Sequence, residues 1–155
     1  MSQICIGVIK GNFDYEQQGE IIQQLDEYMA DDIVKVNRCR FEEDFFKIYK
    51  DSPLYIEMCY RDSSNTCERL ITQEWCKIEP HYELPKLKYR LEAIRKLLQK
   101  IYFDYGNVEL WIGDSGGDDK DYPCIIVTLE DFVDQLELLY LKESHFEPDV
   151  HVIIA

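Results

Sequence analysis

The first apolar segment of the chain, Gln3 to Ile9, is hydrophobic at both odd and even positions. Because the side chains of a strand point alternately to the two faces of a sheet, this segment is predicted to be a central strand with helices covering both faces. Farther along, apolar residues recur at helical spacing, and Asp14 with Gln17 three residues later fits a capping box. We therefore expect a helix from about Tyr15 to Ala30.

Alternation of apolar and polar residues predicts two more strands in the middle of the chain, Val34 to Cys39 and Leu54 to Tyr60. Between them, Phe41 to Tyr49 fits either a helical turn or a strand. The turn-forming residues Asp62 to Asn65 precede a segment rich in β-forming residues, Thr66 to Ile78. This segment is predicted to pair back as a hairpin.

The clearest helical pattern begins at Leu84-Pro85 and stops before Gly106, where a glycine commonly ends a helix. The next stretch, Asn107 to Phe132, predicts a strand, an acidic glycine-rich loop, a second strand and the start of a helix capped by Thr128. A final strand is expected over Asp149 to Ala155.

These elements predict an α+β fold, with a central mixed or antiparallel sheet of about five to seven strands and three main helices packed on it. The chain of 155 residues fits one domain, 1–155. It contains no internal repeat, low-complexity segment or linker that would indicate a second one.

The composition makes the chain strongly acidic, with 31 Asp and Glu against 17 Lys and Arg and a net charge of −14. The excess is concentrated in the last third, because residues 101–155 contain thirteen acids and only two bases. Such a surface repels nucleic acid and anionic membranes and favours basic proteins. We therefore expect a basic protein partner, no direct nucleic-acid contact and no membrane. The basic side of the helix before Gly106 is best explained as a solvated face or by pairing with acids.

The N-terminal apolar run is too short for a signal peptide, and no basic region precedes it. We therefore predict a cytoplasmic protein. The six cysteines show no CxxC spacing, and in a reducing compartment they are expected to be buried thiols without disulfides.

The string Gly113 to Gly117 spells GDSGG, which surrounds the nucleophilic serine of chymotrypsin-like proteases. That serine requires a histidine oriented by a buried aspartate. The upstream His81 stands in a different local sequence from the one that family uses. The residue after Gly117 is Asp118, where the family has a proline. The protease interpretation is rejected, no catalytic residue is identified, and the protein is not expected to be an enzyme.

Metal and cofactor patterns are also incomplete. The aspartates of the same loop lack EF-hand spacing, so only an irregular calcium site remains open against a solvated acidic turn. The zinc candidates Cys59, Cys67, Cys76 and His81 lack paired short spacing. His151 has no second ligand in register and is expected to be structural. No phosphate-binding glycine motif occurs, so no metal or cofactor is predicted.

The aromatic residues beside the acidic loop are more informative. If Leu110 and Ile112 face the core, Glu109 and Trp111 share the opposite face. A tryptophan and a tyrosine among carboxylates are typical of a hot spot for a partner rich in arginine and lysine, although Trp111 buried beneath the helices fits equally well. The predicted partner-binding residues are Glu109, Trp111, Asp114, Asp118, Asp119, Asp121 and Tyr122, with Glu130, Asp134 and Glu137 of the last helix as a second surface.

As a small, acidic, tyrosine-rich α+β chain without catalytic motifs, the protein resembles the immunity proteins of bacterial toxin–immunity systems, such as contact-dependent growth inhibition. The resemblance implies a non-enzymatic inhibitor that covers a basic nuclease toxin. One alternative is a small enzyme or ligand-binding regulator with a pocket between sheet and helices. Another is a nucleic-acid mimic that inhibits DNA-binding proteins.

Overall fold

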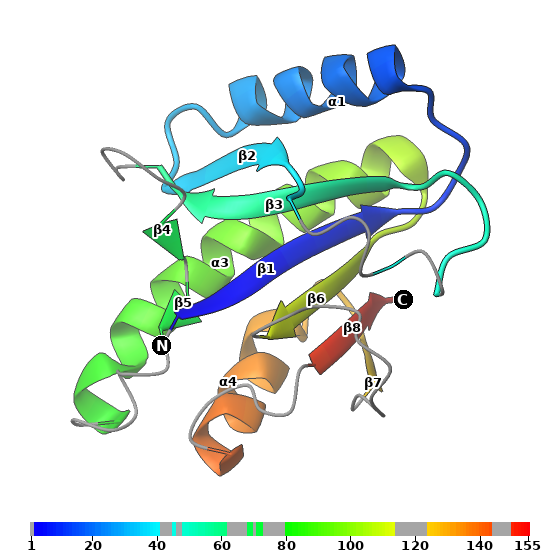
Figure 1. Cartoon of the computed structure of the whole chain (residues 1–155). Coiled ribbons are helices and arrows are strands. Elements are labelled where there is room, and N and C mark those ends of the chain that lie inside the picture. Colours follow the sequence, from blue (N-terminus) through cyan, green and yellow to red (C-terminus); the bar gives the residue numbers. More distant parts are fainter. Residues whose placement is uncertain are drawn as a thin grey trace.

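A computed structural model describes residues 2–40, 45, 48–61, 68–69, 71–72, 80–113, 124–143 and 150–155. In this part of the chain, three helices lie against one β-sheet (Figure 1). The α+β architecture predicted from the sequence is confirmed.

The main path of the sheet has the strand order β2-β3-β1-β6-β8-β7. Its strands are β1 (Ser2–Ile9), β2 (Val34–Arg38), β3 (Leu54–Tyr60), β6 (Glu109–Gly113), β7 (Cys124–Val127) and β8 (Val150–Ile154). Two short strands, β4 (Glu68–Arg69) and β5 (Ile71–Thr72), pair with β3 and β1. Among the described strands, only β7 and β8 run parallel and the other pairs are antiparallel, so the sheet is mixed as expected.

The helices follow the predicted capping signals. Helix α1 (Tyr15–Tyr28) begins with the capping box, in which the Asp14 side chain accepts a hydrogen bond from the backbone N–H of Gln17 at 2.8 Å. Helix α3 (Pro80–Tyr105) starts earlier than predicted and ends at Gly106, whose φ of 77° suits glycine. Helix α4 (Phe132–Glu143) follows Thr128, whose hydroxyl accepts from the Asp131 N–H at 3.1 Å.

All three helices pack on the same face of the sheet (Figure 1). One continuous core joins Leu25 of α1, Leu91 of α3 and Phe132 of α4 to inward-facing strand residues such as Ile56 and Leu110. Among the described residues, no helix covers the second face of β1, so the expectation of helices on both faces is not met there. The apolar residues of β1 indicate that both faces of the strand are buried. They do not indicate whether a helix or another segment buries each face.

The second face of β1 is covered by a short segment around Phe45 instead. Phe45 packs against Tyr55 and Trp111, with ring centroids 5.5 and 5.4 Å apart, in a small cluster that also includes Ile6. The backbone N–H groups of residues 48 and 49 both donate to the carbonyl of Phe45, at 3.0 and 3.1 Å. Of the two structures considered for this segment, its described residues form the helical turn.

The return of the chain beside β3 confirms the predicted hairpin at its described residues, where Arg69 lies opposite Cys59. Cys59 is disulfide-bonded, whereas Cys5, Cys39 and Cys124 are thiols. The expectation of a chain without disulfides is wrong, because it was based on cysteine spacing and on an expected reducing compartment, and neither determines whether two thiols meet in the fold. Among the described residues, no helix combines the length and apolar character needed to cross a membrane.

Candidate functional site

The face of the sheet turned away from the helices carries a cluster of polar and aromatic side chains on β6 and β8. Glu109 and Trp111 lie opposite Val8 and Ile6 of β1, and Trp111 also pairs with His151 of β8. Because Leu110 and Ile112 enter the helix-side core, the predicted alternation of β6 is confirmed.

Trp111 is buried, with 3% of its surface exposed, but the helices do not cover it. Its ring stacks on that of His151, with centroids 4.0 Å apart and an interplanar angle of 10°, and Phe45 covers it from the edge. The indole Nε1–H donates a hydrogen bond to the Tyr49 hydroxyl at 2.9 Å. Trp111 is therefore part of an internal cluster and does not lie on an exposed patch.

Glu109 is the centre of this cluster and is only 4% exposed. Its Oε1 accepts a hydrogen bond from the Tyr49 hydroxyl at 2.9 Å and is also bonded to His151 Nε2. The Lys10 ammonium lies 3.0 Å from Oε2. Because an ionised carboxylate can only accept, the proton of this His151 bond resides on Nε2.

The ionisation states follow from these contacts. Burial favours the neutral form of Glu109, but its hydrogen bonds with His151, Lys10 and Tyr49 outweigh burial and lower its pKa from 4.5 to about 2. Burial also raises the pKa of Tyr49 well above its usual value, with a smaller contribution from Glu109. Both pKa values are far from neutrality, where general acid–base catalysis is efficient. The arrangement is suited to holding a fixed charge.

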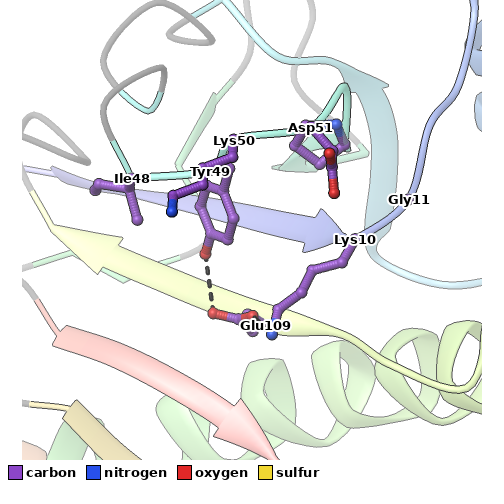
Figure 2. Close-up of a pocket in the computed structure, with 8 residues that line it drawn as sticks. Lys10, Gly11, Ile48, Tyr49, Lys50, Asp51 and Glu109 are labelled. Carbon is purple, nitrogen blue, oxygen red and sulfur yellow. Dashed lines mark hydrogen bonds and ion pairs between the residues drawn. The ribbon is translucent and has the colours of Figure 1, made fainter.

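A cavity of about 350 Å³ adjoins Glu109 at this face. In Figure 2, Tyr49 points from the chain above β6 toward Glu109, and the Lys10 side chain reaches the same carboxylate from the end of β1. The cavity is lined by Lys10, Gly11, Ile48, Tyr49, Lys50, Asp51, Pro53 and Glu109. It brings together both signs of charge and several apolar groups.

A second buried carboxylate lies on the same face. Glu57 of β3 is 1% exposed and receives two hydrogen bonds from the Arg40 guanidinium, at 2.9 and 3.3 Å. This bidentate pair raises the pKa of Arg40. Both buried acids of this face are thus neutralised by a basic side chain.

The second predicted surface lies at the opposite edge of the sheet from α1. Glu130 and Asp134 are exposed, with Glu130 in the turn before α4 and Asp134 in the first turn of the helix. Glu137 is half-buried, and burial raises its pKa, with further contributions from Lys88, which lowers it, and Asp134, which raises it. Among the described residues, its Oε1 has no hydrogen-bond partner.

Between α4 and the edge strand β7 lies an apolar groove that sequence reasoning missed. Ile126 is 69% exposed and Leu138 of α4 is 62% exposed. They line a cavity of about 430 Å³ together with Ile125, Val127, Gln135 and Leu139. The available signal was Leu138, which falls outside the apolar stripe of its helix. We call Ile126, Leu138 and the acids Glu130, Asp131 and Asp134 the β7–α4 surface.

The remaining predicted partner-binding residues, Asp114, Asp118, Asp119, Asp121 and Tyr122, lie outside the described residues, as do Ser115 and the zinc candidates Cys67 and Cys76. Within the described ranges, no group of three or more His, Cys, Asp or Glu side chains is placed to hold a metal ion.

Two lysines on the basic side of α3 pair with acids, which is one of the two explanations that the sequence left open. Lys96 lies 2.6 Å from Asp32, and Lys100 lies 3.1 Å from Asp104.

Comparisons with protein-family models, with curated proteins and with solved structures find no match.

Proposed function

We propose that this protein is a non-enzymatic inhibitor of the immunity type, which neutralises a basic protein, in particular a nuclease toxin domain, by covering it. The observation that carries the proposal is the β7–α4 surface. There, an apolar groove with Ile126 and Leu138 exposed lies between β7 and α4, and the exposed acids Glu130, Asp131 and Asp134 stand just before α4 and in its first turn. Protein interfaces commonly combine such an apolar centre with a polar rim.

The charge of the surface selects the partner. A nuclease must present positive charge to the phosphates of its substrate, so its substrate-binding side is complementary to the acids of this surface. The net charge of −14 accelerates encounter with such a partner through long-range steering. The apolar groove then supplies contact area that excludes water, which slows dissociation.

The edge position of β7 provides a further way to bind. Among the described residues, β7 pairs with β8 on one side only. The free backbone groups of an edge strand can pair with an extended segment of another protein. An added strand at β7 would lie beside Ile126 and near the acids that precede α4.

The test uses the toxin domain encoded beside the gene for this protein. Charge reversal at both Glu130 and Asp134 to lysine is expected to lower the association rate roughly tenfold and to weaken its salt dependence. The matched control reverses the exposed Glu16 and Glu20 of α1, a helix that packs at the opposite edge beside β2. This control should change the rate less than about twofold, because exposed charges beyond a Debye length are screened.

The groove is tested separately through dissociation. Replacing exposed Ile126 with glutamate should raise the dissociation rate by about tenfold or more, because it places a charge at the apolar centre of the contact. Unchanged affinity in this variant would place the contact elsewhere. A neighbouring gene product that is not toxic, or that does not bind, would overturn the proposed function.

A cytoplasmic location is the remaining part of the proposal. The disulfide at Cys59 counts against it, because disulfides are rare in reducing compartments. Cell fractionation distinguishes a cytoplasmic location from a secreted or periplasmic one. Recovery from a secreted or periplasmic fraction would refute the cytoplasmic assignment.

A further inference from the structure

We propose that the cavity beside Glu109 is a binding site for a small zwitterion, a molecule that carries an ammonium and a carboxylate close together, such as a free amino acid. The site lies on the face of the sheet opposite the helices (Figure 2). It is separate from the β7–α4 surface, and its occupancy does not depend on the proposed toxin partner.

The floor of the cavity is a preorganised negative charge. The Glu109 side chain is 5% exposed, and hydrogen bonds to Tyr49 and His151 fix its Oε1. Oε2 is buried and pairs with the Lys10 ammonium at 3.0 Å. A carboxylate oxygen has two lone pairs, so Oε2 can accept a second hydrogen bond from the ammonium of a ligand.

The rim supplies the complementary positive charge. Lys50 is exposed, and the Lys10 side chain, 60% exposed, also reaches the cavity. These two ammonium groups can bind a ligand carboxylate while Glu109 binds its amine. Asp51 stands at the same rim and balances Lys50.

The balance of charges selects the ligand class. A simple anion would meet Glu109 and Asp51, and a simple cation would meet Lys10 and Lys50. A zwitterion can place its ammonium toward the two acids and its carboxylate toward the two lysines. The volume of about 350 Å³ lies near the lower end of the range for ligand sites and suits a small molecule, while Ile48 and Pro53 offer apolar contacts to its side chain.

The probes are the protein L-amino acids, each added alone at matched ionic strength, with propionate and ethylammonium as the single-charge counterparts of alanine. Binding is measured by the melting temperature and by tryptophan fluorescence, because Trp111 donates to the Tyr49 hydroxyl that contacts Glu109. At least one amino acid should raise the melting temperature saturably. The single-charge probes should bind at least about tenfold more weakly, since each lacks one of the two charge contacts. No effect from any amino acid, or equal binding of propionate or ethylammonium, would overturn the proposal.

Variants at the rim and the floor separate binding from folding. Lys50→Ala removes an exposed side chain and should weaken amino-acid binding about tenfold without changing the melting temperature of the free protein. Lys35→Ala, which removes an exposed lysine of β2, is the matched control and should bind like the wild type. Glu109→Gln should abolish binding. Wild-type affinity in Lys50→Ala would exclude the proposed carboxylate contact and overturn the assignment.

Discussion

Replacing Glu109 with glutamine tests the charge at the centre of the polar cluster. The hydrogen bonds around Glu109 lower its pKa from 4.5 to about 2 in the folded protein, against the effect of burial. A depressed folded pKa means that the unfolded state binds the proton more readily. The resulting stabilisation is therefore complete above about pH 4.5 and is lost as the pH falls toward about 2. A shift of one pKa unit corresponds to about 1.4 kcal/mol. The ionisation of Glu109 therefore contributes roughly 3 kcal/mol to the free energy of unfolding at neutral pH.

The assay is urea unfolding of the wild type and of Glu109→Gln across this pH window. Other carboxylates also titrate there, so the informative quantity is the difference in the free energy of unfolding between the two proteins. That difference should shrink by up to about 1.4 kcal/mol for each pH unit below about 4.5, because protonated Glu109 resembles glutamine in charge. Glu20→Gln, an exposed position on α1, is the matched control and should show a nearly constant difference.

A difference for Glu109→Gln that stays constant over the same window would refute this reasoning. It would mean that the ionised carboxylate is no more stable in the folded cluster than in the unfolded chain. The bonds to Tyr49 and His151 would then stabilise the structure without favouring the charge.

Three further substitutions test local features by chemical denaturation. Asp14→Ala should cost about 1 kcal/mol by removing the α1 cap, and Asp14→Ser should restore most of it; an equally destabilised serine variant would contradict the capping role. Phe45→Ala should cost about 3 kcal/mol or more and shift Trp111 fluorescence to the red in a Trp75→Phe background, because Phe45 is fully buried against Trp111; an unshifted spectrum would mean that Phe45 does not shield the indole. Gly106→Ala should cost about 1 kcal/mol through backbone strain alone, because φ is 77° and an added Cβ meets nothing within 4 Å; no loss would contradict the strain.

Much of the fold could be predicted from the sequence because its signals are local. The capping box at Asp14, the helix end at Gly106 and the alternation of β6 each depend on residues within a few positions of one another. Such patterns report backbone preference and burial directly. They were sufficient for the α+β class and for most element boundaries.

The cover of the second face of β1 was not predictable in the same way. The apolar residues Ile6 and Val8 indicate burial, but the covering side chains include Phe45 and Tyr49 from a distant part of the chain. Only the tertiary structure decides whether a helix or a short turn fills that position. The disulfide at Cys59 was missed for a related reason, because the spacing of cysteines along the chain does not show which thiols meet in the fold.

The candidate site shows the same division. The sequence indicated that Glu109 and Trp111 share a face of their strand. It also showed the excess of acidic residues in the last third of the chain, to which Glu130 and Asp134 belong. It could not show that Glu109 is buried among Lys10, Tyr49 and His151, which are distant in the chain. It also could not show that Ile126 remains exposed at the edge of the sheet.

The sequence by itself thus determined the elements, their capping and the sign of the surface charge, because these depend on composition and on neighbours along the chain. Tertiary structure alone decided which face of the sheet the helices cover, which carboxylates are buried and paired, and where apolar side chains stay exposed. The physical reason is that burial and charge pairing depend on residues brought together through space. Glu109 is the clearest case, since its ionised state in the fold depends on partners from three separate segments of the chain.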